Sequence, residues 1–391
     1  MTKEDPETER RRLLRDAQRV VIKVGTSIVS GSAGEVNAVY VESLVRSMAA
    51  LKTAGRQVVL VSSGAVGLGA GRLGLHPSRL ADLVVRQACA AVGQSLLMHA
   101  YEQLFRVHDV RIAQVLLTED DFSDWKRYTN LRRTMEKLLK LGVLPIVNEN
   151  DTVATAELEY VVSSQERVFG DNDRLAALVM SGLESDALVL LTNVDGLLRQ
   201  APKSVDGEEA KPIPIVEEIT QELKAIAAGP SAGGRGGMLT KLEAAQIAMQ
   251  AGGVAVIANG MKPEVLNSIF AGEQMGTTFM STSRMAGKRR WITYAAGVRG
   301  RVIVNEGARN AIIGGKASLL SSGVVRVEQQ FESQDVVSIA DSQGCEFARG
   351  IINCASEEAE ALIEGKSAAP SAGERARVLV TRDNMVVSEQ R

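Results

Sequence analysis

The sequence predicts an α/β fold in which an open, doubly wound and mainly parallel sheet is followed by a small β-rich domain. Six runs have apolar residues at consecutive positions, which is typical of strands covered on both faces. Helical patterns separate these runs, as the crossovers of a parallel sheet require. After residue 290 the pattern changes to short strand-like runs punctuated by glycine.

The elements of the sheet domain alternate along the chain. Strands are expected at residues 19–24, 57–61, 111–117, 143–147, 187–191 and 254–258. Helices are expected at residues 36–53, 79–105, 130–141, 172–180 and 240–250, with a break near Gly93 in the second of them. Each strand runs into a polar or glycine-containing loop. Because ligands of such sheets bind beyond the carboxyl ends of the strands, these loops are the expected functional site.

Composition along the chain predicts the domain boundaries. Residues 1–16 are crowded with charge and are expected to form a disordered extension. The sheet domain is expected over residues 17–295 and the β-rich domain over residues 298–391, joined by a linker at residues 288–291 (KRRW). In the β-rich domain, strands are expected at residues 300–304, 324–327, 336–340, 345–352 and 377–381, and helices at 306–313 and 356–363.

Overall composition limits the class of function. The 391 residues include 45 basic and 47 acidic side chains, a net charge of −2, and only 4% are aromatic. A general nucleic-acid binder carries a basic excess, and a single-strand binder needs aromatic side chains for base stacking, so both classes are disfavoured. No apolar window reaches the length of a membrane span, and the charged N-terminus lacks the apolar stretch of a signal peptide. Since the three cysteines show no paired spacing, we expect a cytoplasmic protein.

Two lysines stand in loops suited to phosphate binding. Lys23 lies at the end of the first strand and precedes Gly25 and two hydroxyl residues, whereas Lys241 opens a helix after a stretch with four glycines. Backbone N–H groups of such loops, helix N-termini and ammonium groups all attract phosphate oxygens. The first segment is also compatible with a solvated lysine before a turn, and the second with a flexible linker. Neither matches the Walker sequence.

Amide and carboxylate side chains gather in two further loops, at residues 148–151 (NEND) and 170–173 (GDND), and Ser63 lies in a third. Asn and Asp together can hold the ammonium and carboxylate groups of an amino acid or position lysines, although ordinary turn and cap chemistry would also explain them. The three histidines lie outside these loops and are expected to be surface or packing residues. Phosphoryl transfer to a carboxylate fits this set, because it depends on charge neutralisation and its acceptor is already ionised at pH 7. The loops alone do not identify the acceptor.

Eight segments in a fixed order are far more specific than any one of them. They are KVGTS (23–27), VSSGAV (61–66), AVGQ (91–94), QVLLT (114–118), NENDTVAT (148–155), GDND (170–173), TNVDGL (192–197) and GRGGMLTK (234–241). Over residues 17–295 this pattern resembles the glutamate 5-kinase branch of the amino-acid kinase family. The following segments VNEGA (304–308) and GKASLL (315–320) resemble the PUA domain that many of these kinases carry at the C-terminus.

The resemblance implies ATP-dependent phosphorylation of the γ-carboxyl group of L-glutamate, the first step towards proline. It implies that Lys23 and Lys241 hold the β,γ-phosphates and that Asp173 orients these lysines. Glutamate would be held by Ser63, Asp151 and Asn172. The nucleotide would be held by Lys23, Gly25, Thr192, Asn193, Arg235, Gly236, Gly237, Met238, Leu239, Thr240 and Lys241. Mg²⁺ would be carried mainly by nucleotide oxygens and water. The resemblance also implies a homo-oligomer and allows feedback inhibition by proline.

This chain departs from the family pattern at three places. Arg235 stands where the family often has Thr, Asn193 stands where some members have Asp, and residues 158–169 form a longer connection beside the expected glutamate site. Such a connection is most simply a tolerated surface insertion.

Two other functions stay open at this point. Related kinases for other carboxylates typically begin Lys-x-Gly-Gly, whereas Gly25 is followed here by Thr26. An RNA-binding or regulatory protein could act through its PUA-like domain, although the 11 basic and 13 acidic residues of residues 298–391 argue against strong nonspecific binding.

Overall fold

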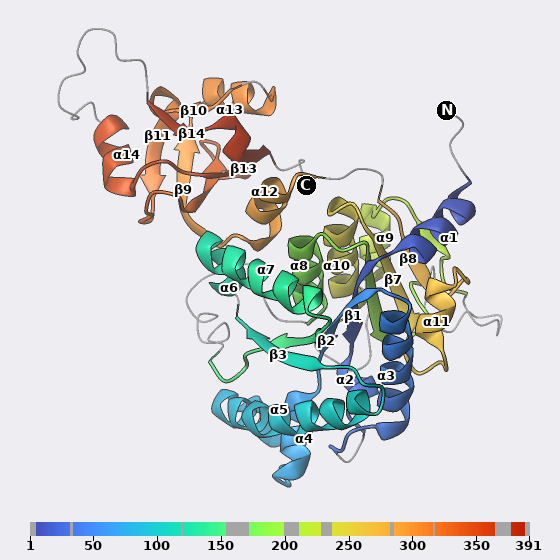
Figure 1. Ribbon diagram of the computed structural model, residues 1–391. Coiled ribbons are helices and arrows are strands. Elements are labelled where there is room, and N and C mark those ends of the chain that lie inside the picture. Colours follow the sequence, from blue (N-terminus) through green and yellow to red (C-terminus); the bar gives the residue numbers. More distant parts are fainter. Residues whose placement is uncertain are drawn as a thin grey trace. The chain divides into compact units, whose positions relative to one another are not determined.

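The computed structural model describes residues 5–31, 34–118, 120–153, 172–198, 211–227, 237–281, 285–315, 317–363 and 377–387. These residues form two compact units (Figure 1). The first contains the described residues of Met1–Asp121 and Lys126–Met285, and the second contains those of Phe122–Trp125 and Ala286–Arg391.

The first unit is built on an eight-stranded sheet in the order β3-β4-β2-β1-β5-β7-β8-β6. Neighbouring strands are parallel except for the antiparallel pair β7–β8, so the prediction of an open, mainly parallel sheet is confirmed. The bounds are β1 Arg19–Val24, β2 Gln57–Ser62, β3 Ile112–Leu117, β4 Leu144–Glu149, β5 Ala187–Thr192, β6 Ile215–Val216, β7 Val254–Asn259 and β8 Thr277–Phe279. The sequence pattern missed β6 and β8, which are too short to show a periodicity.

Helices cover both faces of this sheet (Figure 1). On one face, α3, α5 and α11 pack against Ile22, Leu60 and Val256 in one apolar core; on the other, α8 contacts β1 and α10 contacts β7. The bounds are α1 Pro6–Asp16, α2 Thr26–Val29, α3 Ala38–Thr53, α4 Ala65–Arg72, α5 Leu83–Arg106, α6 Asp120–Ser123, α7 Trp125–Lys140, α8 Asn172–Leu183, α9 Gln221–Ala227, α10 Met238–Gln250 and α11 Val265–Phe270. No helix in the described ranges has both the length and the apolar character that crossing a membrane requires.

Helix α5 continues through Gly93, so the predicted break is wrong. A Cβ atom built at Gly93 would overlap the carbonyl oxygen of Ala65, and one built at Gly69 would overlap that of Cys89. The two glycines therefore allow the backbones of α4 and α5 to touch. Gly93 therefore allows close helix packing and does not bend or end helix α5.

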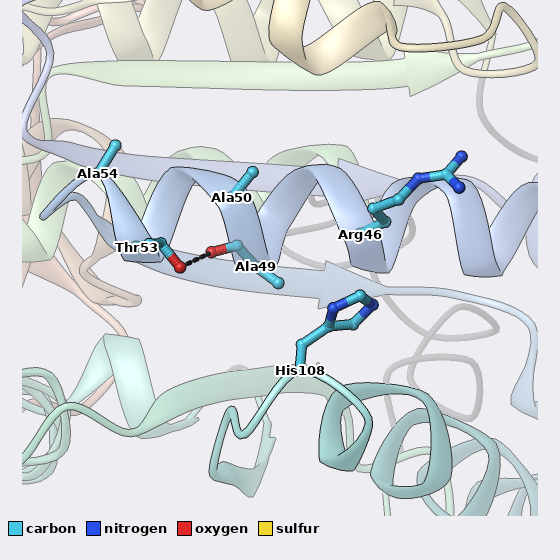
Figure 2. Close-up of a pocket in the computed structure, with 6 residues that line it drawn as sticks. All are labelled: Arg46, Ala49, Ala50, Thr53, Ala54 and His108. Atoms are coloured by element: carbon cyan, nitrogen blue, oxygen red, sulfur yellow. Dashed lines mark hydrogen bonds between the residues drawn. The ribbon is translucent and has the colours of Figure 1, made fainter.

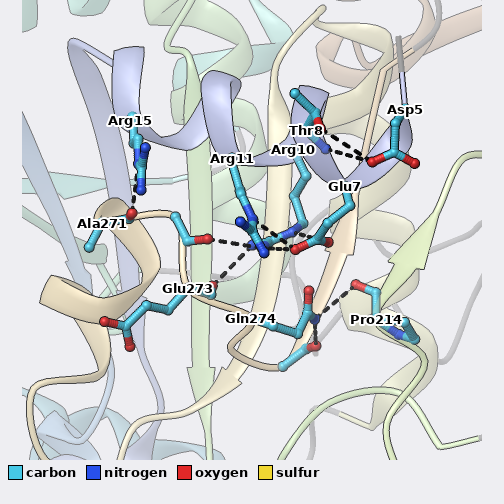
Figure 3. Close-up of polar contacts among 12 residues, drawn as sticks. Asp5, Glu7, Thr8, Arg10, Arg11, Arg15, Pro214, Ala271, Glu273 and Gln274 are labelled. Carbon is cyan, nitrogen blue, oxygen red and sulfur yellow. Dashed lines mark hydrogen bonds and ion pairs between the residues drawn. The ribbon is translucent and has the colours of Figure 1, made fainter. Parts of the chain in front are cut away.

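The expectation of disorder over residues 1–16 is wrong for Pro6–Asp16, which form α1 (Figure 3). Asp5 caps the helix by accepting a hydrogen bond from the backbone N–H of Thr8 at 3.2 Å. Arg10 is fully buried and donates to the carbonyl oxygens of Gly272 and Glu273, each at 3.0 Å. Part of the charge that suggested disorder is thus buried, where Arg10 donates hydrogen bonds to carbonyl groups of the turn after α11.

The second unit has a five-stranded sheet in the order β11-β9-β12-β13-β15 and a two-stranded sheet, β10–β14. Within the larger sheet only β9 and β12 pair in parallel, which confirms a β-rich domain. The strands are β9 Val298–Val304, β10 Leu319–Leu320, β11 Val324–Glu328, β12 Val336–Ala340, β13 Glu346–Ile351, β14 Val378–Val380 and β15 Met385–Val387. The helices are α12 Gly287–Arg290, α13 Glu306–Ile313 and α14 Ser356–Ile363.

The predicted linker at residues 288–291 is part of the second unit. Helix α12 leads into a π-helical turn at Trp291–Ala295. Trp291 is buried, its indole N–H donates to the carbonyl oxygen of Phe122 at 2.7 Å, and its ring packs edge-on against Trp125. The basic residues suggested a solvated connection, but the apolar Trp291 anchors this segment.

Candidate active site

Two lysines and one aspartate meet at the carboxyl ends of the central strands. Lys23 Nζ lies 2.6 Å from Asp173 Oδ1, and Lys241 Nζ lies 3.0 Å from Asp173 Oδ2. Asp173 is fully buried, and the two lysines are only 5% and 6% exposed. Two ammonium groups therefore share one carboxylate in a region shielded from water. Because ammonium groups form strong hydrogen bonds with phosphate oxygens, the cluster is suited to bind an anionic group.

Local structure brings these three residues together from distant parts of the chain. Val20, Ile22 and Val24 face the core beneath α3 and α5, so alternation along β1 turns Lys23 towards the face covered by α8 and α10. Asp173 lies in the first turn of α8 and Lys241 near the start of α10, on that same face.

The electrostatics of the cluster keep its carboxylate ionised. Burial raises the pKa of Asp173, but the charges of Lys23 and Lys241, with their hydrogen bonds, outweigh burial and lower that pKa to about 2. Thr240 Oγ1 also donates to Asp173 Oδ2 at 3.2 Å. At neutral pH the aspartate is therefore a fixed negative centre that holds two cationic side chains in place.

A second group of polar side chains lies beside β2 and β4. Asn172 Nδ2 donates to Ser63 Oγ at 2.7 Å and to Asn148 Oδ1 at 3.1 Å, so two of the three predicted glutamate-binding residues are in direct contact. Asn148 Nδ2 in turn donates to Gln94 Oε1 at 2.9 Å. Asp151, the third predicted residue, lies half-buried in the turn that follows β4.

The carboxyl end of β2 is held by a hydrogen-bonded pair, Ser62 and Tyr101. Ser62 Oγ donates to the carbonyl oxygen of Ser63 at 3.1 Å, so the hydroxyl of Tyr101, 2.8 Å away, is left to donate to Ser62. Burial raises the pKa of Tyr101 to about 12, against a smaller opposite effect of the bond to Ser62. The phenol therefore stays protonated and supports the loop that carries Ser63.

The predicted nucleotide-binding residues occupy neighbouring strand and helix ends. Gly25 N–H donates to the carbonyl oxygen of Leu191 at 3.3 Å, next to Thr192 at the end of β5. Thr192 is buried, whereas Asn193 is exposed. Gly237 precedes α10, and the predicted residues Met238, Leu239, Thr240 and Lys241 are its first four residues. The predicted residues Arg235 and Gly236 lie outside the described residues, as does the long connection at 158–169.

A hollow of about 540 Å³ lies elsewhere, against α3 (Figure 2). Its lining residues are Arg46, Ala49, Ala50, Thr53, Ala54 and His108. None of them belongs to the lysine–aspartate cluster or to the group around Asn172. His108 is exposed there, and His76 and His99 are involved in local hydrogen bonds with Ser78 and Gln103.

The described residues contain no group of three or more His, Cys, Asp or Glu side chains that could hold a metal ion. The carboxylate of the cluster is engaged on both oxygens, by Lys23 on one and Lys241 on the other.

Comparisons with known proteins match both units. Residues 18–259 match the amino acid kinase family, and residues 300–373 match the PUA domain. The chain is 45% identical over 346 residues to the glutamate 5-kinase of Caldanaerobacter subterraneus subsp. tengcongensis, which covers 88% of this chain and 90% of that protein. It is 43% identical over 391 residues to the glutamate 5-kinase of Moorella thermoacetica, covering 97% and 99%. Among solved structures, it is similar to the UMP kinase of Bacillus anthracis, with 16% identity and a TM-score of 0.46 over 69% of this chain and 98% of that one.

Proposed function

We propose that Lys23, Asp173 and Lys241 form the phosphoryl-transfer centre of this chain, which belongs to the amino acid kinase family and phosphorylates the γ-carboxylate of L-glutamate with ATP. The product is L-glutamyl 5-phosphate, in the first step of proline biosynthesis. The observation that carries the assignment of residues is the buried cluster of two ammonium groups on one carboxylate. It lies where the loops of a parallel sheet converge.

The reaction needs positioning and charge neutralisation more than proton transfer. A γ-carboxylate oxygen of glutamate forms the new bond to the γ-phosphorus of ATP, while the bond to the β,γ-bridging oxygen breaks and ADP leaves. The acceptor has an ordinary pKa of about 4.3 and is already ionised, so no general base is required. Lys23 and Lys241 neutralise the charge on the moving group, and Asp173 keeps both ammonium groups in one place before the substrate arrives.

The two other groups of residues bind the two substrates. Ser63 and Asn172, joined by a 2.7 Å hydrogen bond, bind glutamate together with Asp151. Gly25, Thr192, Asn193 and the stretch from Arg235 to Lys241 bind ATP, with backbone N–H groups at the start of α10 facing the phosphates. Mg²⁺ bound with ATP would supply further neutralisation of phosphate charge, and nucleotide oxygens and water would be its main ligands.

Assembly into a homo-oligomer and inhibition by proline belong to the same proposal. Proline shares the α-carboxylate and ammonium groups of glutamate, so it would compete for the residues that bind those groups. Proline should then raise the apparent KM for glutamate without lowering kcat, and light scattering of the purified chain should give a mass above that of one chain.

The test is a glutamate-dependent assay with hydroxylamine present to trap the acyl phosphate. ADP release and hydroxamate formation should require glutamate and occur in equal amounts, since each transfer gives one of each. Aspartate and N-acetylglutamate serve as comparison substrates. A higher kcat/KM for either of them, or ADP release without hydroxamate, would contradict the assignment.

A further inference from the structure

A row of hydrogen-bonded side chains connects the middle of α5 with the loop after β2. Gln94 Oε1 accepts from Asn148 Nδ2 at 2.9 Å, and Asn148 Oδ1 accepts from Asn172 Nδ2 at 3.1 Å. Asn172 Nδ2 also donates to Ser63 Oγ at 2.7 Å. Asn148, in the middle of the row, is 3% exposed, whereas Gln94, Asn172 and Ser63 are half-buried. Three separate elements and one loop are thus joined through side-chain amides.

A backbone carbonyl determines which way the side-chain amides of this row are oriented. Asn172 Nδ2 lies 3.4 Å from the carbonyl oxygen of Ser62, and a backbone carbonyl can only accept a hydrogen bond. The amide nitrogen of Asn172 must therefore face β2. This turns the oxygen of Asn148 towards Asn172, and its nitrogen towards Gln94. Because each amide presents oxygen on one side and nitrogen on the other, an oxygen acceptor at Gln94 continues the orientation that the Ser62 carbonyl favours at Asn172.

This direction decides which groups are left for a ligand. The hydroxyl of Ser63 accepts from Asn172, so its own proton is available for donation. Asn172 Oδ1 is buried and has no hydrogen-bond partner among the described residues, so an acceptor without a partner lies beside this donor. A donor and an acceptor side by side match the carboxylate and the ammonium group of an amino acid. Turning Asn172 round would reverse both roles.

The packing of α5 explains why a glutamine on this helix reaches the row. Gly93 lets the backbone of α5 touch that of α4 at Ala65, two residues after Ser63. Gln94 follows directly and is therefore held beside the loop that carries Ser63. Its Nε2 is buried without a partner in the described part of the chain, so the oxygen is the atom through which Gln94 joins the row.

We propose that Gln94 is a positioning residue that determines which side chains of the amino-acid site donate hydrogen bonds to the substrate and which accept them. By accepting from Asn148, it holds the Asn148 oxygen towards Asn172, and thereby keeps Ser63 a donor and Asn172 an acceptor for the substrate. This inference rests on the proposed function, because it assumes that glutamate binds beside Ser63 and Asn172. It requires no contact between Gln94 and glutamate, and none with Lys23, Asp173 or Lys241.

The test is the kinetics of Gln94→Met, which keeps the length of the side chain and removes the acceptor. Without it, Asn148 and Asn172 lose their fixed orientation, so the KM for glutamate should rise about tenfold. The kcat and the KM for ATP should stay within about twofold, because the lysine cluster is untouched. Gln103→Met on the same helix, where the glutamine bonds only to exposed His99, is the matched control and should leave all three constants unchanged.

A double-mutant cycle separates positioning from simple packing. If Gln94 acts through Asn148, then Gln94→Met should cause no further rise in KM when Asn148 is already alanine. Equal effects in both backgrounds, or equal changes of the KM values for glutamate and ATP, would overturn the inference. Gln94→Ala is the second variant if Gln94→Met does not fold, as judged by thermal melting. A wild-type chain that forms no glutamyl hydroxamate would instead contradict the proposed function itself.

Discussion

At the scale of single residues, Asp173 organises the site. It is buried between two ammonium groups that come from a strand and from a helix, and its carboxylate is held ionised by them. Without it, Lys23 and Lys241 would repel each other in a region shielded from water. In the proposed reaction, the same aspartate would stabilise the fold and also hold the two ammonium groups that bind the phosphoryl group.

Asp173→Asn should lower both stability and turnover. We expect the free energy of unfolding to fall by about 3 kcal/mol, since the two buried cations lose their counter-charge. We expect kcat to fall about 10²-fold, because the lysines are no longer held for the moving phosphoryl group. Urea unfolding and the hydroxamate assay measure the two effects. Wild-type stability with unchanged kcat would contradict the role of this carboxylate.

The pH dependence of this stability difference has a defined sign. The pKa of Asp173 is about 2 in the folded chain, below its ordinary value of 3.8, so the unfolded chain binds more protons between these values. The stabilisation is fully present above about pH 5 and is lost as pH falls towards 2. The difference in the free energy of unfolding between wild type and Asp173→Asn should therefore be constant above about pH 5 and should decrease below about pH 4.

Much of the site could be predicted at this scale, because parallel strands bring their following loops to one edge of the sheet. Lys23, Asp173 and Lys241 meet there, as do Ser63 and Asn172. The role of Gln94 could not be derived in the same way. It lies within a helix, where the sequence pattern reports only which face is buried, and its partner Asn148 is 54 residues away.

At the scale of elements, the contact between α4 and α5 places Gln94 beside the loop that carries Ser63. Gly69 and Gly93 each face a carbonyl oxygen of the other helix without space for a side chain. Helix α4 had no periodicity that predicted it, and Gly93 suggested a break in α5. Both differences have one cause. Glycine in a helical pattern is compatible with a helix break or with close packing against another helix, and only the tertiary structure distinguishes the two.

Gly93→Ala should separate the two helices. The added methyl group would overlap the Ala65 carbonyl, so we expect a loss of about 3 kcal/mol in stability despite the better helix propensity of alanine. The shift of α5 carries Gln94 with it, so the KM for glutamate should rise as well. Ser95→Ala, two residues further along α5 at an exposed position, is the control. A variant with wild-type melting temperature would show that the helices are not in close contact here.

At the scale of the whole molecule, the residues of the proposed reaction belong to one unit. Lys23, Asp173, Lys241 and the row from Gln94 to Ser63 all lie within the first unit. The pattern of consecutive apolar runs followed by glycine-punctuated strands was enough to predict two units of different class. It could not show that Phe122–Trp125 pack with the second unit, since that contact depends on the burial of Trp291.

A chain ending at residue 297 should therefore keep glutamate kinase activity within about tenfold of wild type, since domains of this size fold on their own. This end point retains the contacts of Trp291 with Phe122 and Trp125. A chain ending at residue 285, which loses them, is the comparison and should be less stable. A folded 1–297 chain without hydroxamate formation would show that the PUA domain is required for catalysis.

In the proposed mechanism, two ammonium groups held by one carboxylate act together on the transferred phosphoryl group. The most direct test is the kcat of Lys241→Ala at saturating glutamate and ATP, with the exposed Lys140→Ala on α7 as control. We predict a fall of about 10²–10³-fold for Lys241→Ala, with the KM for glutamate within about threefold, since this charge matters most in the transition state. An unchanged kcat in folded Lys241→Ala would contradict the account.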